Sequence, residues 1–475
     1  MNQRSNSSVF ATYTIVAILS ATISFVTMIV LTRTTSEAFF GQINKFLTAS
    51  YLVMSLICLG LDTAYIRFYY EPPENTNSKQ LAWKCIFPAL IAFILVSSAI
   101  MYVRDRSILY PLIGGGGVFF TVAFVITVLS QFLNRFMTIY FRMNNNVLGF
   151  SVLTIAFAIL TKTIFIPTYY IAPKFEDNIV LVVPFLAMFM LVFFAYNAKN
   201  MISFSHDSFL KYKRVYRYAL FSSPVFVITY LNSYLPQVII SNNLGDSVLG
   251  IYSAALLFCS AIQVLSMGFS TFWSPYMYKN YKTENDMIKR VHDIVLLTSV
   301  LVMSSILIFN DFIYLFIGEA FRKNQNILGL LLIYPILLII VDTVAYGIGI
   351  KKKNEITLLI YLISTITNVT LCITLVSKYG LDGIAIASMI SAIVQMVLMT
   401  YFGQKYYQSI NQVSRTLFHI FVLILSAISF YFLYDYRIMF IIAETTMLAI
   451  CLVYDRNVIL WSFDFLKSIR NKRNK

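Results

Sequence analysis

Long apolar stretches separated by short polar ones run along the whole chain. A helix that spans a lipid bilayer needs about 20 largely apolar residues. The stretches of about that length are Val9–Leu31, Ala38–Leu61, Cys85–Val103, Leu109–Leu133, Val147–Pro167, Ile179–Tyr196, Tyr218–Ile240, Val248–Phe272, Val291–Phe312, Ile327–Ile350, Ile356–Val376, Gly383–Tyr401, Leu417–Tyr434 and Ile438–Tyr454. The pattern predicts an all-α polytopic membrane protein with about 14 transmembrane helices.

Basic residues concentrate in every second connecting segment. If the N-terminus is inside, 26 of the 36 Lys and Arg fall in inside segments and 8 in outside segments, while Lys45 and Lys162 lie within predicted helices. Basic residues near the ends of spans stay on the cytoplasmic side. Both termini are therefore expected in the cytoplasm, and the formal net charge of +15 needs no nucleic-acid partner.

The composition agrees with a membrane protein. Hydrophobic residues make up 59% of the chain and charged residues 12%, about half the charged share of a soluble domain. The longest polar stretches, Asp62–Lys84 and Trp273–Arg290, are too short to form a domain. Any activity must therefore lie between the helices.

Two short segments resemble each other. In Leu31–Gly41 and Ile240–Gly250, an acid, an apolar residue and a glycine fall in the same register. The copies are six predicted helices apart, and an even offset preserves orientation in the membrane. The repeat predicts two six-helix lobes in a parallel pseudo-repeat, residues 1–200 and 201–415. Residues 416–475 would add two helices and a basic cytoplasmic tail.

Motifs of catalysis or metal binding are missing from the sequence. It contains no Gly-x-Ser-x-Gly, His-Glu-x-x-His or Walker A motif, and its five cysteines and three histidines have no metal-ligand spacing. We therefore expect no catalytic residues, no cofactor and no metal site.

Ionisable residues within predicted spans are the first functional candidates, because each costs about 2.5–3.5 kcal/mol at the bilayer centre on insertion scales. Lys45 either binds a phosphate in a cavity or extends to the outer interface. Lys162 lies nearer the outer end of its helix, which favours extension to the interface. Asp342 and Glu444 are candidates for proton or cation coupling. For Asp342, a structural ion pair with Lys351–Lys353 is the alternative.

Two further groups of residues suggest a moving, cationic transporter. Arg33 and Arg67 flank the same pair of predicted helices that contains Lys45, which makes a shared cationic site testable. Taken alone, each arginine is better explained as an interface anchor. Pro224 and Pro236 interrupt the predicted seventh helix and are candidate hinges, although static kinks are the alternative.

The N-terminal residues also carry a family resemblance. The chain has a Leu-x-Arg, an acid and a Phe-Gly before the second predicted helix, then Gly-Leu-Asp-x-Ala-x-x-Arg-Phe at its far end. These are Leu31, Arg33, Glu37, Phe40, Gly41, Gly60, Leu61, Asp62, Ala64, Arg67 and Phe68. This pattern resembles the polysaccharide (Wzx-type) flippases of the multidrug/oligosaccharidyl-lipid/polysaccharide (MOP) superfamily. The segment Lys378–Gly383, before the twelfth predicted helix, also resembles that family.

The resemblance implies a flippase in the bacterial plasma (inner) membrane. Such proteins move undecaprenyl-diphosphate-linked oligosaccharides from the inner to the outer leaflet by alternating access, beside membrane lipid, a polysaccharide polymerase and other assembly proteins. Arg33 and Arg67 occupy family motif positions and would bind the diphosphate, whereas Lys45 is a candidate on physical grounds alone. Fourteen helices instead of twelve resemble the lipid II flippase branch.

Two other functions stay open. A cation-coupled multidrug exporter of the same superfamily would use intramembrane acids, of which this chain has few. A membrane-embedded polysaccharide polymerase or glycosyltransferase would need a long outer loop with catalytic residues, and the predicted outer loops are short.

Overall fold

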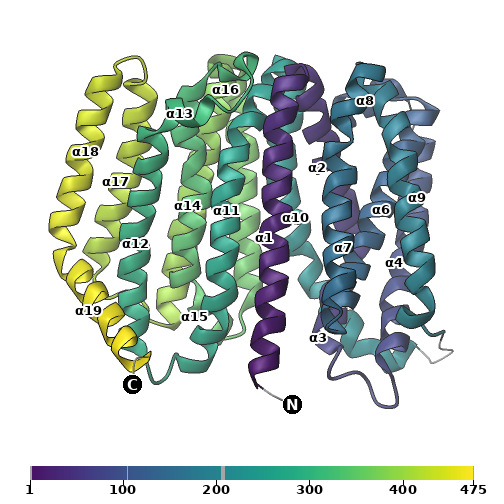
Figure 1. Ribbon diagram of the computed structural model, residues 1–475, viewed down its shortest axis with the longest axis horizontal. Coiled ribbons are helices and arrows are strands. Elements are labelled where there is room, and N and C mark those ends of the chain that lie inside the picture. The colour runs from purple at the N-terminus through teal and green to yellow at the C-terminus, as the bar shows by residue number, and fades with distance from the viewer. Residues whose placement is uncertain (1–2, 104, 205–208, 474–475) are drawn as a thin grey trace. The chain divides into compact units, whose positions relative to one another are not determined.

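The computed structural model describes residues 3–103, 105–204 and 209–473. Within these ranges the regular structure is entirely helical, and the long helices of each unit lie alongside one another (Figure 1). The chain divides into two compact units, Met1–Ser253 and Ala254–Lys475, and each is described by itself. The predicted division after residues 200 and 415 stays a prediction.

The first unit is a bundle in which α6 packs on α9, α2 on α10 and α1 on α7. Its elements are α1 (Gln3–Thr34), α2 (Glu37–Cys58), α3 (Leu61–Phe68), α4 (Ser78–Tyr102), α5 (Arg106–Ile113), α6 (Val118–Met143), α7 (Val147–Ala158), the π-helix η1 (Ile159–Thr163), α8 (Phe165–Ile171), α9 (Phe175–Met201), the 3₁₀-helix η2 (Phe209–Tyr212), α10 (Lys213–Leu244) and the first turns of α11 (Asp246–Asn280).

A sharp bend joins α2 to α3 and positions much of the site described below. Leu59 and Gly60 both have left-handed backbone angles, with φ of 49° and 71°, and the two helices meet at 57°. A Cβ added at Gly60 would collide with the carbonyl oxygen of Ala219 on α10. Glycine therefore permits both the turn and the close approach of α10.

The second unit is built around α14, which is buried along most of its length and packs on α12, α16 and α17. Its elements are the rest of α11, α12 (Asn285–Ile308), α13 (Asn310–Tyr314), the 3₁₀-helices η3 (Glu319–Arg322) and η4 (Gln325–Ile327), α14 (Leu328–Val344), α15 (Tyr346–Ile350), α16 (Asn354–Tyr406), α17 (Val413–Phe432), α18 (Arg437–Tyr454) and α19 (Arg456–Arg473). Gly380 breaks the helical geometry within α16, at φ 56° and ψ −130°.

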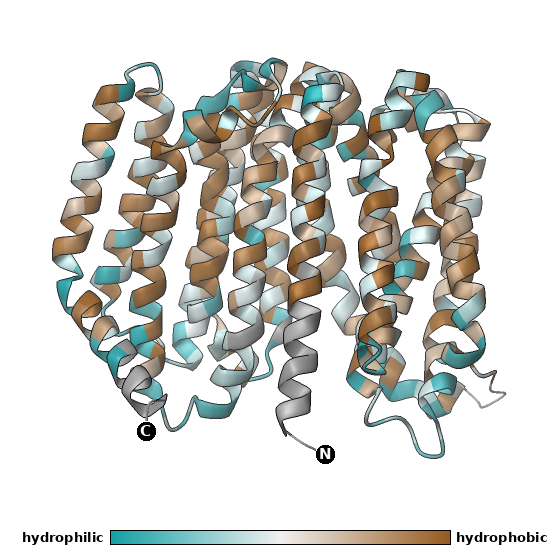
Figure 2. Ribbon diagram, viewed as in Figure 1, coloured by the Kyte–Doolittle hydropathy of each residue, from teal (hydrophilic) through white to brown (hydrophobic). Residues whose placement is uncertain are grey.

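The structure confirms the predicted fold class. Ten helices of the described part are long and apolar enough to cross a membrane, and eleven are when the bent pair α2–α3 is included. Apolar residues cover the middle of the helices, and hydrophilic residues collect at their ends and in the loops (Figure 2). Two predicted spans merge in α16, whose arms on either side of Gly380 correspond to Ile356–Val376 and Gly383–Tyr401.

The predicted span Leu109–Leu133 is interrupted. Residues 114–117 are not helical, so that α5 ends before them and α6 begins after them. Gly114 and Gly117 have φ of 88° and 90°, a region that glycine enters without steric cost. The glycine run thus ends one helix and starts another.

Candidate ligand-binding site

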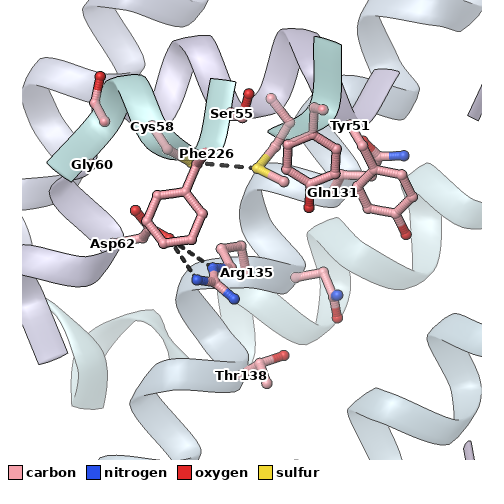
Figure 3. A pocket seen from close by; sticks show the side chains of 13 residues that line it. Tyr51, Ser55, Cys58, Gly60, Asp62, Gln131, Arg135, Thr138 and Phe226 are labelled. Atoms are coloured by element: carbon pink, nitrogen blue, oxygen red, sulfur yellow. Dashed lines mark hydrogen bonds and ion pairs between the residues drawn. The ribbon is translucent and has the colours of Figure 1, made fainter. Parts of the chain in front are cut away.

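A polar cavity of about 260 Å³ lies inside the first unit, between α2, α3, α6 and α10 (Figure 3). We call it the polar cavity. It is unusual for a membrane bundle because carboxylate, guanidinium, amide and hydroxyl groups all line it. The lining residues are Tyr51, Met54, Ser55, Cys58, Gly60, Asp62, Gln131, Asn134, Arg135, Thr138, Ser223, Phe226 and Tyr230.

An ion pair between Asp62 and Arg135 forms one wall of the polar cavity. Arg135 donates from Nη2 at 2.7 Å and from Nε at 2.8 Å to Oδ2 of Asp62. The Asp62 side chain is 10% exposed, whereas the Arg135 side chain is 41% exposed. Asp62 lies in the first turn of α3, where the helix dipole also favours a negative charge. The arginine therefore presents a held, charged donor group that solvent reaches.

Amide and aromatic groups form the rest of the cavity wall. Gln131 of α6 donates from Nε2 to Oγ of Ser50 at 2.7 Å and is itself 1% exposed. Tyr51 of α2 and Tyr230 of α10 stack with ring centroids 6.2 Å apart and planes 8° apart. These contacts hold the amide and the two rings in place before any ligand arrives.

A second pocket lies beside the polar cavity, along α3 and α10. Its lining includes three arginines, Arg67 of α3 with Arg214 and Arg217 of α10, and we call it the arginine pocket. Glu71 is the one acid in this lining, and it accepts from Nη1 of Arg67 at 2.9 Å. The arginine pocket therefore has an excess of positive charge.

The two pockets follow each other along α10. Residues 214–221 of α10 line the arginine pocket, and residues 223–230 line the polar cavity. At 1.5 Å rise per residue, their centres are separated by about 13 Å along the helix axis. The pockets follow each other in the same way along α3, where Asp62 lines the polar cavity and Arg67 lines the arginine pocket.

Arg33, Lys45 and Arg67, the residues predicted to bind the diphosphate, do not lie together in the described part of the chain. Arg67 lines the arginine pocket at the end of α3, and Arg33 is exposed in the last turn of α1 at the opposite end of the unit (Figure 1). Lys45 is fully buried on α2. A direct role for Arg33 and Lys45 in diphosphate binding stays a prediction.

Lys45 lies in a polar cluster of its own. Its Nζ donates to the hydroxyl of Ser241 and lies 3.4 Å from Oδ1 of Asp246. The same carboxylate accepts from Nε2 of Gln42 at 2.8 Å and from the hydroxyl of Ser241. Lys45 thus ties α2 to the junction of α10 and α11 and does not extend to an interface.

The two candidate coupling acids lie in the second unit with different surroundings. Asp342 of α14 is half-buried and accepts from the hydroxyl of Ser270. Among the described residues no ion pair joins it to Lys351–Lys353. Glu444 of α18 is 1% exposed and accepts from the hydroxyls of Ser304 and Ser426. Their coupling role stays a prediction.

Both candidate hinge prolines lie inside α10, which continues through them from Lys213 to Leu244. Pro236 is buried, and Pro224 is half-buried beside Ser223 of the polar cavity. Each proline removes one backbone hydrogen bond from the helix. Their role as hinges stays a prediction.

Sequence reasoning missed the most developed part of the site. Asp62 belongs to the family motif, but Arg135, Arg214 and Arg217 are visible in the sequence only as basic residues near predicted helix ends. The one available signal is the opposite charge of Asp62 and Arg135 at neighbouring helix ends. That signal does not specify the pairing, since the residues are 73 positions apart.

The second unit contains a buried ion-pair network between α12, α17 and the residue after α18. Arg415 of α17 pairs with Asp293 of α12 at 2.9 Å and with Asp455, which follows α18, at 3.3 Å. His419 Nε2 lies 2.6 Å from the same Asp455. The described residues contain no group of three or more His, Cys, Asp or Glu arranged to hold a metal ion.

Comparisons with known proteins agree with this architecture. Residues 9–281 match the family described as polysaccharide biosynthesis protein, whereas no curated protein matches the chain. Among solved structures, the lipid II flippase MurJ in an inward closed conformation is 15% identical with a TM-score of 0.69. That match covers 94% of this chain and 99% of MurJ.

Multidrug transporters have the same fold. An inward-facing multidrug resistance MATE family transporter of the MOP superfamily is 14% identical with a TM-score of 0.61, over 81% of this chain and 94% of that one. The MATE transporter VcmN of Vibrio cholerae is 15% identical with a TM-score of 0.57, over 86% and 99%. The chain therefore belongs to the polysaccharide biosynthesis protein family and has the fold of MOP-superfamily transporters.

Proposed function

We propose that this protein is a flippase that moves an undecaprenyl-diphosphate-linked oligosaccharide, one repeat unit of a polysaccharide, from the inner to the outer leaflet by alternating access. In this proposal it resides in the bacterial plasma membrane with both termini in the cytoplasm. It hands its cargo to a polysaccharide polymerase and other assembly proteins. Its work is binding and movement, with no catalytic step.

The observation that carries the proposal is the arginine pocket beside the polar cavity. A diphosphate and its sugars cannot enter hydrocarbon unaided, because each buried polar group without a hydrogen bond costs several kcal/mol. Arg67, Arg214 and Arg217 offer planar donors suited to phosphate oxygens. Neighbouring pockets for a charged group and for a polar one are what a lipid-linked oligosaccharide requires.

The second candidate is a cation-coupled multidrug exporter. Two carboxylates within spanning helices, Asp342 of α14 and Glu444 of α18, favour it. Exporters of cationic drugs need acids in their binding cavity, however. The one carboxylate in the lining of the polar cavity is Asp62, and it is paired with Arg135.

Gene deletion followed by mass spectrometry of lipid-linked oligosaccharides tests the proposal. With the polymerase intact, we expect one undecaprenyl-diphosphate-linked repeat unit to build up, and its mass identifies the cargo. Wild-type protein should clear it, whereas the double variant Arg214→Gln/Arg217→Gln should not. The matched control Lys213→Gln/Lys282→Gln removes the same charge from exposed lysines outside the arginine pocket and should clear it.

An opposite outcome identifies the alternative. If no lipid-linked species changes while sensitivity to cationic drugs rises, the flippase proposal is wrong and the exporter takes its place. Asp342→Asn and Glu444→Gln would then be the variants to test, and Asp342→Asn is expected to lower resistance more.

A further inference from the structure

The last helix, α19, is too charged to cross the bilayer. It follows the spanning helix α18 with one residue between them, and residues 456–475 contain six basic residues and one acid, Asp464. A spanning helix needs about 20 largely apolar residues, and a charged side chain is costly inside hydrocarbon. α19 therefore lies at the surface of the membrane or in the water beside it.

The junction with α18 fixes the direction in which α19 leaves. Asp455 joins the two helices: its backbone N–H donates to the carbonyl of Cys451 at 2.9 Å, and its own carbonyl accepts from the N–H of Ile459 at 3.0 Å. The Asp455 carboxylate is fully buried, 3.3 Å from Nε of Arg415 and 2.6 Å from Nε2 of His419. α19 is therefore built into the second unit and is not a free tail.

One side of α19 is occupied by the rest of the second unit. The helix packs on α12 and α18, and Val458 is buried. The guanidinium of Arg290, on α12, stands 4.8 Å from the centre of the Trp461 ring. Figure 1 shows α19 running from the lower end of α18 towards the lower end of α12. The opposite side of the helix faces away from these contacts.

That opposite side carries a row of exposed residues, Arg456, Leu460, Phe463 and Lys467, which we call the α19 stripe. Steps of four, three and four residues place them on one face of a helix. Leu460 is 52% and Phe463 60% exposed, and the two basic residues at the ends of the stripe are exposed as well. Helices that lie in a membrane interface have this arrangement, because apolar side chains enter the lipid while Lys and Arg extend to its phosphates.

Exposed apolar side chains also precede the junction. Leu452 and Val453, in the last turn of α18, are 40% and 77% exposed. Because α18 is long and apolar enough to span the membrane, lipid covers such side chains. The α19 stripe begins at Arg456, three residues after Val453. The lipid beside the end of α18 therefore also lies beside the start of α19.

The charge of the helix matches an anionic surface. Asp464 lies about 100° round the helix from Phe463, so that it lies beside the α19 stripe and not on it. Basic residues next to a spanning segment are attracted to the anionic lipids of the cytoplasmic leaflet. An acidic protein would also satisfy these charges. Lipid accounts in addition for the apolar centre of the stripe, which follows the lipid-facing end of α18.

We propose that α19 lies along the inner surface of the membrane and that the α19 stripe binds the headgroups of anionic phospholipids. Leu460 and Phe463 enter the lipid, and Arg456 and Lys467 contact phosphates on either side of them. This lipid-binding element is separate from the polar cavity and the arginine pocket. It rests on the proposed function only for the side of the membrane, because the C-terminus is placed in the cytoplasm there.

A fluorescent label on full-length protein in lipid nanodiscs tests where the stripe lies. All five native cysteines are buried, so that an environment-sensitive NBD label attaches selectively to Phe463→Cys or to the control Asn457→Cys. Asn457 is also exposed but lies about 120° round the helix from Phe463. In equal parts of phosphatidylcholine and phosphatidylglycerol, we expect brominated acyl chains to quench the label on Phe463→Cys and aqueous iodide to quench the label on Asn457→Cys.

Native mass spectrometry tests the preference for anionic headgroups. Protein released from the same nanodiscs retains bound lipids, and the ratio of phosphatidylglycerol to phosphatidylcholine among them is measured. We expect Arg456→Gln/Lys467→Gln to lower this ratio by about three- to tenfold. The control Lys213→Gln/Lys282→Gln removes the same charge from exposed residues outside α19 and should lower the ratio much less.

The outcomes decide what covers the stripe. If iodide quenches both labels equally, the stripe lies in water and the proposal is wrong. Shielding of the Phe463→Cys label by added cytoplasmic extract would then identify a protein as the occupant. If Arg456→Gln/Lys467→Gln and its control change the lipid ratio equally, the stripe does not bind headgroups. Neither measurement involves the lipid-linked oligosaccharide, so that the flippase proposal and the lipid-binding stripe can fail independently.

Discussion

The ion pairs of Lys45 and of Arg67 differ in burial, and therefore in what they contribute to stability. Lys45 is completely buried and is compensated by Asp246 and Ser241, whereas Arg67 and Glu71 form a pair that is 52% and 71% exposed. Exposed pairs contribute at most about 1 kcal/mol, but removing one partner of a buried pair costs about 3–5 kcal/mol. The two pairs therefore lead to opposite expectations for stability.

We expect Lys45→Met to lower the free energy of unfolding by about 3 kcal/mol, because it leaves Asp246 without its buried counter-charge. The double variant Lys45→Met/Asp246→Asn should recover most of the loss. Denaturant unfolding of the purified protein measures both, and Arg67→Gln, expected to cost less than about 1 kcal/mol, is the control. Equal losses from Lys45→Met and Arg67→Gln would contradict the structural role of Lys45.

The two coupling candidates should behave differently. Asp342 is half-buried with one serine donor, whereas Glu444 is 1% exposed and held by two serine hydroxyls. An ion or proton must reach the carboxylate that couples it. We therefore expect Asp342→Asn to lower gradient-driven transport in proteoliposomes more than Glu444→Gln does. The same decrease without an imposed sodium or proton gradient would exclude a coupling role.

At the scale of helices, the internal repeat has a structural meaning. A Cβ added at Gly41 would collide with the carbonyl oxygen of Asp246, and one added at Gly250 would collide with that of Glu37. Gly41 corresponds to Gly250 in the repeat, and Glu37 corresponds to Asp246. The two copies therefore pack against each other reciprocally at the starts of α2 and α11.

Alanine at either glycine of this contact should be destabilising. We expect Gly41→Ala and Gly250→Ala each to cost about 1–3 kcal/mol, the usual penalty for overpacking, because the backbones must separate. Gly268→Ala in the same α11 is the control, since nothing lies within 4 Å of its added Cβ. Alanine there should stabilise the helix by up to about 1 kcal/mol. Thermal unfolding of the three variants compares them, and a stable Gly250→Ala protein would refute the close contact.

The candidate site shows where prediction from sequence stopped. Asp62 and Arg67, which lie at the start and end of α3, belong to the motif found in the sequence. The pairing of Asp62 with Arg135, and of Lys45 with Asp246, joins residues 73 and 201 positions apart. Helical periodicity relates only residues within a few turns, so neither pairing could be read from the chain.

At the scale of the whole molecule, the distribution of charge predicts the topology. Thr283 lies in a predicted inside loop and Lys323 in a predicted outside loop, and both side chains are exposed. All five native cysteines are buried, namely Cys58, Cys85, Cys259, Cys372 and Cys451. A single introduced cysteine is therefore expected to react against a low background.

We expect a membrane-impermeant maleimide to label Lys323→Cys in intact spheroplasts and to spare Thr283→Cys until the cells are lysed. Basic residues near the ends of spans are retained in the cytoplasm, which places Thr283 inside. The unaltered protein is the control for background labelling. The reverse pattern would show that both termini face outward and would invert the proposed direction of transport.

The sequence by itself determined the class of this protein. The length of an apolar stretch decides whether it can span the bilayer, and the distribution of basic residues sets its orientation; both follow from the order of residues alone. It also determined the family motif and the repeat. Only the tertiary structure decided which of the charged residues are bound to each other. It placed Arg67 with Arg214 and Arg217 and buried Lys45 against Asp246. Such choices depend on how bundle helices rotate and pack, and that packing is specified by contacts between distant parts of the chain.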